Sequence, residues 1–307
     1  MAIKRSFSDY VVDFCIYAFL IILLFLVLYP FLNSLAISFN NADDTTRGGI
    51  GLWPRIPTLA SYQRIITDNK IWNAYFITVS RTAVGTFAAL FCTGIIAFGL
   101  AHNKLIGRRV YSLLCIIPMY FGGGLIPYYL LIRGLGMMNS FWVYIIPNLI
   151  GLFNIIIMRT FFQEIPEALE ESAQIDGANY LTVFFRIIVP ISTPIIATIA
   201  LFVGVMHWNA WFDATIFVTK ENLKPMQNIL MRIVNEAAYA ERMAALTGGA
   251  AGSGASSAMG NIARGRQVNV RSITMATMFI TIIPVIIVYP FLQRFFVKGI
   301  MVGSIKG

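Results

Sequence analysis

The chain has 307 residues, of which 58% are hydrophobic and only 12% charged, and its formal net charge is +9. Soluble domains carry about a quarter charged residues, so this composition excludes an ordinary soluble fold. A positive charge can indicate nucleic-acid binding, but here Lys and Arg lie at the ends of apolar runs or in loops, which favours contact with membrane lipid instead.

Six apolar runs predict an all-α, polytopic membrane protein. In chain order they are Val12–Leu35, Asn73–Leu100, Val110–Ile132, Phe141–Phe161, Ile187–Met206 and Ile273–Phe296. A membrane helix needs about 20 residues, which each run supplies when occasional polar residues are tolerated. A signal peptide is the alternative for the first run, but its apolar stretch is too long for a signal core. We expect a single transmembrane domain over residues 1–307.

An even number of membrane helices places both termini on the same side. The short basic loop 102–109, with Lys104, Arg108 and Arg109, indicates that this side is the cytoplasm, because Lys and Arg are enriched in short cytoplasmic loops. Segment 164–190 then also lies in the cytoplasm, and the long loops 36–72 and 207–272 lie outside. Within the second of these, Thr247–Gly260 is rich in Gly, Ala and Ser, which is typical of a flexible linker.

Segment 164–190 is the longest charged stretch between apolar runs. Five carboxylates lie between Glu164 and Asp176, Gly177 interrupts the segment, and Pro190 leads into the next apolar run. A helix that stops at Gly and restarts toward Pro predicts helix–turn–helix. Such a segment suits contact with another protein, although a solvated amphipathic connector is the alternative.

No motif for enzyme chemistry or metal binding is found. Phe121–Pro127 is glycine-rich but lacks the Lys-Ser/Thr of a phosphate-binding loop, so it predicts close packing or a kink in a membrane helix. The two histidines, His102 and His207, have no metal-ligand spacing, and Cys15, Cys92 and Cys115 form no Cys-x-x-Cys pair. We therefore expect a chain that is not an enzyme, holds no metal and does not itself bind ATP.

Two features within or beside the membrane runs are candidates for function. Arg81 is a cation inside the second run, which we interpret as paired or reaching the outer interface. The polar–aromatic stretch His207–Asp213 is a candidate substrate path, because aromatic faces with amide and carboxylate groups suit sugar rings. Its candidate residues are Trp208, Asn209, Trp211 and Asp213. Anchoring of tryptophan at the membrane interface is the alternative.

The spacing in segment 164–190 resembles a known motif. Glu171-Ser172-Ala173, then Gly177 four residues later and Ile187 ten after that, are similar to the coupling loop, or EAA motif, of bacterial ABC importer permeases; Ser172 and Val189 depart mildly from it. Six helices, a long loop before the last one and a Gly-x-x-Lys-Gly tail resemble the maltose-importer-type permeases of carbohydrate ABC importers. Within this group, the chain resembles the LplC-type oligosaccharide permeases.

This resemblance implies a set of partners in a bacterial plasma membrane. They are a second homologous permease, two copies of a cytoplasmic ABC ATPase that bind ATP and Mg, and an extracytoplasmic sugar-binding protein. The chain itself would carry no cofactor. The ATPase-coupling residues would be Glu167, Glu170, Glu171, Ser172, Ala173, Asp176, Gly177 and Ala178. Glu171 would pair with the ATPase, Gly177 would form the turn, and the tail Met301–Gly307 would reach the ATPase dimer.

Other functions remain open from the sequence. A permease of the same superfamily for peptides or amino acids shares the coupling loop. An ion-coupled secondary transporter is disfavoured, because no acid lies deep in any run. A membrane scaffold or sensor would need a soluble signalling domain, which this sequence does not show.

Overall fold

A computed structural model describes residues 7–246 and 270–304. The Gly-rich segment Thr247–Gly260 and the last three residues of the predicted tail lie outside the described part. Contacts divide the chain into two units, one of Met1–Asp68 with Arg232–Thr281 and one of Asn69–Met231 with Ile282–Gly307.

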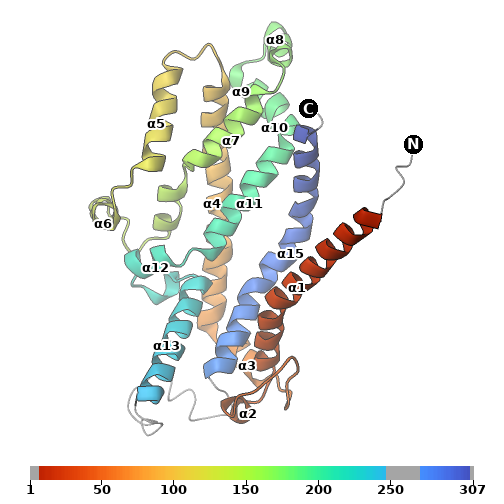
Figure 1. Ribbon diagram of the computed structural model, residues 1–307. Helices are drawn as coiled ribbons and strands as arrows, with labels where there is room; N and C mark the ends of the chain where they lie inside the picture. Colours follow the sequence, from red (N-terminus) through yellow and green to blue (C-terminus); the bar gives the residue numbers. More distant parts are fainter. Residues whose placement is uncertain (1–6, 247–269, 305–307) are drawn as a thin grey trace. The chain divides into compact units, whose positions relative to one another are not determined.

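The described residues form helices joined by loops, and their β-pairing is an isolated bridge between Asn40 and Pro57 (Figure 1). The α-helices are α1 (Phe7–Ser38), α2 (Ala42–Thr46), α3 (Ala60–Ile66), α4 (Asn69–Ala101), α5 (Arg108–Tyr120), α6 (Leu125–Gly134), α7 (Leu152–Gln163), α8 (Glu167–Ile175), α9 (Tyr180–Val183), α10 (Val189–Ile191), α11 (Thr193–Asn209), α12 (Phe212–Phe217), α13 (Met226–Leu246) and α15 (Val270–Ser304). Short 3₁₀ helices cover Phe141–Tyr144, Ile146–Asn148 and Glu221–Leu223, and Phe184–Ile188 is a π-helix.

Three helices of the described chain are long and apolar enough to cross a membrane alone. These are α1, α4 and the part of α15 over Val270–Pro290, and they match the first, second and sixth predicted runs. Three bent pairs pass the same test together: α5 with α6, Phe141–Asn148 with α7, and Tyr180–Ile191 with α11. Counting each pair as one span gives six, which agrees with the all-α polytopic fold expected from the sequence.

The third, fourth and fifth predicted runs are bent rather than straight, and the kink predicted at Phe121–Pro127 falls in the third. Their halves are bent by 118°, 47° and 84° respectively. Gly122–Gly124 separate α5 from α6, since glycine favours extended or left-handed backbone, and Gly124 has φ +82°. In the fifth run the bend falls at Ser192, between Pro190 and Pro194, where the missing proline N–H groups interrupt the helical hydrogen bonds.

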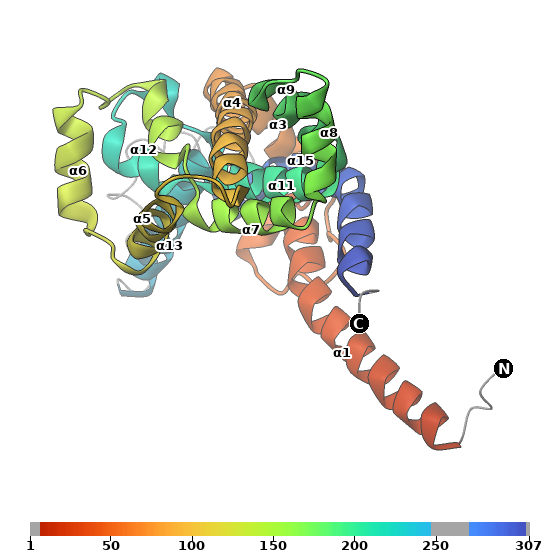
Figure 2. The same ribbon diagram turned by 90° about the horizontal axis from the view of Figure 1, so that it is seen from above.

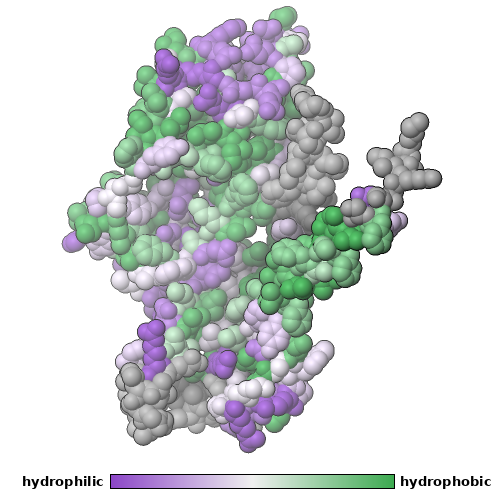
Figure 3. Space-filling view, viewed as in Figure 1, coloured by the Kyte–Doolittle hydropathy of each residue, from purple (hydrophilic) through white to green (hydrophobic). Residues whose placement is uncertain are grey.

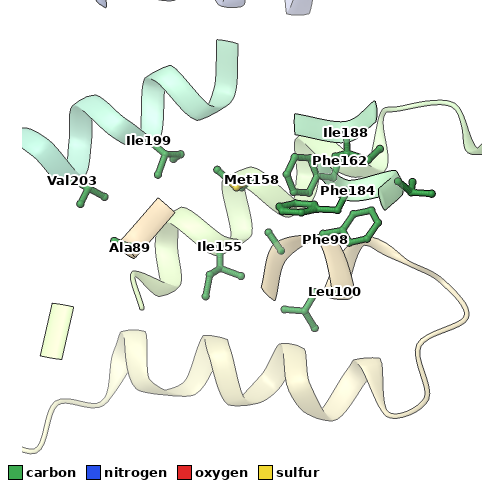
Figure 4. Packing of buried hydrophobic residues seen from close by; sticks show 12 residues of the cluster. Ala89, Phe98, Leu100, Ile155, Met158, Phe162, Phe184, Ile188, Ile199 and Val203 are labelled. Carbon is green, nitrogen blue, oxygen red and sulfur yellow. The ribbon is translucent and has the colours of Figure 1, made fainter. Parts of the chain in front are cut away.

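In the second unit, α4 packs along α7 and α11. Figure 4 shows the buried cluster between them, in which the rings of Phe98, Phe162 and Phe184 face one another. Phe98 lies 5.2 Å from Phe184 and 6.5 Å from Phe162 between ring centroids. Ala89 and Ala97 on α4 are fully buried, and such small residues allow helices to approach closely where lipid gives no hydrophobic driving force.

The surface of this unit separates by polarity (Figure 3). Hydrophilic residues gather around α8, whereas the surface over α5 is hydrophobic. Apolar side chains on α5 are exposed, including Val110, Leu113, Leu114 and Ile117. This distribution suits a helix that faces apolar surroundings beside a polar membrane boundary.

In the first unit, a polar network orders the loop after α1. The Asn33 side-chain amide donates to the carbonyls of Ile50 and Gly51 at 2.7 and 2.9 Å. Asn40 donates to Asp44 Oδ2 at 2.9 Å, and Arg55 Nε pairs with the same oxygen at 2.9 Å. These hydrogen bonds order part of the segment 36–72, which the sequence predicted as a long loop.

Candidate coupling helix and buried polar cluster

The charged segment forms the predicted helix–turn–helix. Helix α8 begins after Pro166 and carries Glu167 and Glu170 in its first turn. Carboxylates at a helix N-terminus are stabilised by its unpaired N–H groups and macrodipole. Glu171 and Ser172 on α8 are exposed, and the Ser172 hydroxyl donates to the Ala168 carbonyl at 2.8 Å.

Gly177 ends α8 in a Schellman turn. Its φ is +86°, a left-handed conformation that favours glycine. The Gly177 N–H donates to the Gln174 carbonyl and the Ala178 N–H donates to the Ala173 carbonyl, at 3.0 and 2.9 Å. Ala173 and Ala178 also pack against the cluster of Figure 4, so the turn is anchored to the core of the unit.

The chain then restarts as a second helix. The Asn179 side chain accepts from the Thr182 N–H at 2.8 Å and caps α9. The exposed Asp176 lies at the C-cap of α8. Both helices of this segment lie beside the end of α4 (Figures 1 and 2).

Side chains at the end of α4 contact the first turns of α8. His102 Nε2 lies 2.7 Å from Glu170 Oε2, and the Asn103 amide donates to Glu167 Oε1 at 3.4 Å. A cavity of about 200 Å³ opens between α8 and this loop, and Glu171 is among its lining residues. Glu170 is therefore engaged within the chain, whereas Glu171 has no partner among the described residues.

The second candidate site surrounds Arg81. The side chain of Arg81 is fully buried on α4; its Nη2 lies 3.3 Å from Asp213 Oδ2, and its Nη1 donates to the Ala210 carbonyl at 3.0 Å. The guanidinium also lies 4.3 Å from the ring centroid of Tyr144. The expectation of pairing holds, and the partner is one of the residues assigned to a substrate path.

The proposed substrate-path residues contact different parts of the chain. Trp208 is buried with its ring edge-on to Tyr75, and Asn209 Oδ1 accepts from the Gln227 amide at 3.2 Å. Trp211 is half-buried and its ring lies against Phe212. These contacts give Trp208 and Asp213 packing and ion-pair roles.

Tyr144 was not predicted as a member of the cluster around Arg81, and His207 was named only as the start of the polar–aromatic stretch. Tyr144 supplies an aromatic face to Arg81, and its hydroxyl donates to the Leu223 carbonyl at 2.9 Å. His207 is buried against Gly85, where an added Cβ would lie 2.4 Å from Nε2. An intramembrane cation calls for a nearby counter-charge, so Arg81 was a signal that one of the few acids lies beside it. Along residues 7–246 and 270–304, no three His, Cys, Asp or Glu residues come together as metal ligands.

These features define a multi-pass helical membrane protein whose polar helix–turn–helix connects two membrane segments. Comparison with known proteins gives 36% identity over 96% of this chain and 98% of YtcP, a polygalacturonan/rhamnogalacturonan transport system permease protein of Bacillus subtilis (strain 168). Protein LplC of the same organism is 34% identical over 92% of this chain and 90% of its own length. No family model matches.

A solved structure has the same fold. It is a crystal structure of a bacterial ABC transporter involved in the import of the acidic polysaccharide alginate. Its matched chain has a TM-score of 0.84 and 27% identity, covering 96% of this chain and 100% of that chain. The chain belongs to the family of permease subunits of carbohydrate-uptake ABC importers.

Proposed function

We propose that this subunit takes up an oligosaccharide by alternating access, together with a second homologous permease, two copies of an ABC ATPase and an extracytoplasmic sugar-binding protein. The similarity to YtcP, a polygalacturonan/rhamnogalacturonan transport system permease protein, and to the ABC transporter involved in alginate import supports a transport system of this kind. In this proposal the partner ATPase binds ATP and Mg and hydrolyses ATP, and the present chain is not catalytic.

One observation carries the proposed coupling role. Helix α8 is a short acidic helix, anchored to the core of its unit through Ala173 and Ala178 and ended by the left-handed Gly177. A short anchored helix transmits a displacement as a unit. In the proposal, Glu171 pairs with a basic group of the ATPase while Glu167, Ser172 and Asp176 complete the docking surface.

The proposed orientation places both termini and α8 in the cytoplasm. It rests on six spans and on the basic residues of the short loop 102–109. In this orientation, loop 36–72 and loop 207–272 face outside, where the sugar-binding protein delivers its cargo. The half-buried Trp211 and exposed Asn209 remain proposed contacts along the substrate path.

Purification in mild detergent from the native host, followed by mass spectrometry, tests the assembly. We expect a second permease and an ATPase at about two copies per permease pair. The complex is then screened for sugar-stimulated ATP hydrolysis with uronic-acid and neutral oligosaccharides. A lone chain, or a homo-oligomer with no ATPase, would contradict the proposal.

Glu171→Ala tests the coupling role within that complex. Truncating one side of a desolvated charge pair costs about 2–5 kcal/mol, so sugar uptake should fall at least about tenfold while ATP hydrolysis persists. Glu164→Ala is the matched control, because Glu164 is an exposed acid at the C-cap of α7 and does not line the cavity. Wild-type sugar uptake by the Glu171→Ala complex would show that Glu171 does not take part in the interface with the ATPase.

A further inference from the structure

His102 connects the end of α4 to α8 through both of its ring nitrogens. Nδ1 lies 2.8 Å from the Phe98 carbonyl oxygen, and Nε2 lies 2.7 Å from Glu170 Oε2. Phe98 contacts the ring edge-on at 4.5 Å between centroids, and Tyr180 does so at 5.7 Å. The imidazole is therefore held in one orientation by aromatic contacts and hydrogen bonds.

The partners of the two ring nitrogens define the protonation state of His102. A carbonyl oxygen only accepts, so Nδ1 must carry the hydrogen that it donates to Phe98. In the neutral ring Nε2 is then a lone-pair acceptor, and facing an ionised Glu170 it would meet a second acceptor. A 2.7 Å contact between Nε2 and Oε2 therefore requires one further proton. Imidazole is a stronger base than a carboxylate, so that proton belongs on Nε2.

The neighbouring charges are compatible with an imidazolium at this position. The cavity beside His102 is lined by Glu167 and Glu171 from α8, by Tyr180 from α9 and by Lys104 from the loop. Two carboxylates besides Glu170 and one ammonium group thus line the cavity beside the ring.

We propose that His102 is a positioning residue for α8. Its hydrogen bond from Nε2 to Glu170 Oε2, called the tie below, exists only while the imidazole is protonated. When Nε2 loses its proton, its lone pair faces a lone pair of Glu170 Oε2. The two atoms then repel each other, and the first turn of α8 is released from the end of α4. The tie keeps Glu170 directed inward, and Glu167 and Glu171 are exposed on the same helix. The inference deepens the proposed function, since it rests on α8 as the coupling helix.

Nitrogen NMR of the complex reconstituted with histidine label in this chain alone tests the tie without any transport. The chain contains two histidines, so loss of one signal set in His102→Gln assigns the spectrum. Across a pH series from acid to alkali, we expect His102 in the wild-type complex to change from protons on both ring nitrogens to a proton on Nδ1 alone. In Glu170→Gln the side-chain amide donates to Nε2, so the neutral Nδ1–H form should persist to lower pH. A neutral Nε2–H form in the wild type would overturn the proposal.

Sugar uptake per ATP hydrolysed tests the positioning role. In the wild type this ratio should be about fivefold higher at about pH 6 than at about pH 8.5, because protonation of His102 forms the tie. Glu170→Gln should hold the ratio nearly constant between the two pH values, and His102→Ala should lower it at both. Arg109→Gln removes an exposed cation at the start of α5 and should follow the wild type. If His102→Ala transports as much sugar per ATP hydrolysed as the wild type, His102 does not position α8, even if NMR shows the tie. A complex that hydrolyses ATP without moving sugar would contradict the proposed function and leave the NMR test of the tie standing.

Discussion

Arg81 Nη2 and Asp213 Oδ2 lie 3.3 Å apart although 132 positions separate the two residues in the chain. The Arg81 side chain is fully buried, whereas that of Asp213 retains 23% exposure. The pair joins α4 to α12 within the second unit. It therefore neutralises a cation that would otherwise be isolated inside a membrane-spanning helix.

Asp213→Ala should destabilise the protein by about 3 kcal/mol, because it leaves a buried guanidinium without its counter-charge. The measurement is thermal unfolding of the purified protein in detergent. Arg81→Met combined with Asp213→Ala should recover part of the loss, since both charges are then absent. An unchanged unfolding temperature for Asp213→Ala alone would show that the pair contributes nothing.

Gly85→Ala should cost about 1–3 kcal/mol through overpacking, because the new methyl group would lie 2.4 Å from His207 Nε2. Gly99→Ala is the matched control on the same helix, as its Cβ would have no neighbour within 4 Å. Unfolding temperature and the elution profile of the purified variant report the difference. Equal stability of the two variants would mean that His207 moves aside freely.

Gly177→Ala should weaken the turn after α8 by about 1 kcal/mol, since an L side chain disfavours φ +86°. The new methyl group meets no atom within 4 Å, so the effect comes from backbone conformation alone. Limited proteolysis at 166–180 measures the loosening, with Gly134→Ala as the control in ordinary, open surroundings. Identical cleavage of both variants would contradict this interpretation.

The loop after α1 should lose stability in acid through Asp44. The hydrogen bond from Asn40 lowers the pKa of the Asp44 carboxyl below its ordinary value; burial opposes this shift, and Arg55 adds to it. A lowered pKa in the folded state means that the contribution is complete above the ordinary value and is lost as pH falls through the folded value. The difference in unfolding temperature between wild type and Asp44→Asn should be constant above about pH 5 and shrink below about pH 4.

Asn40→Ala supplies the check on that cause. Because the Asn40 bond is the largest contribution, its removal should move the acid transition of the loop to higher pH. A difference between wild type and Asp44→Asn that stays constant down to about pH 3 would exclude Asp44 as the titrating group.

The sequence predicted the membrane helices correctly where the length of an apolar run is enough to define a continuous helix. Runs 12–35 and 73–100 are continuous in α1 and α4, and Gly177 ends α8 as its position indicated. Apolar length is the same for a straight helix and for a bent pair, so the 84° bend at Ser192 could not be read from hydropathy. Pro190 and Pro194 were the local signal for it.

Pairings between distant residues were the part least accessible from the sequence. The sequence marked Arg81 as needing a counter-charge, and Asp213 lay in a stretch already singled out, but nothing local linked the two. The tie between His102 and Glu170 depends on the packing of α8 against α4. That packing depends on how the side chains of elements far apart in the chain fit together. Amino-acid composition and hydrophobic periodicity carry no information about this fit.

The break between α5 and α6 has a consequence for where this chain is stable. At 1.5 Å per residue, α5 with 13 residues and α6 with 10 reach roughly 20 and 15 Å, each short of a hydrocarbon core about 30 Å thick. The non-helical Phe121–Gly124 between them therefore lies at membrane depth if the pair is one span, and its backbone is exposed in the isolated chain. Lipid tails offer no hydrogen bonds to such backbone. If the pair is one span, this stretch therefore faces protein or water, and a single copy of the chain surrounded by lipid supplies neither to it.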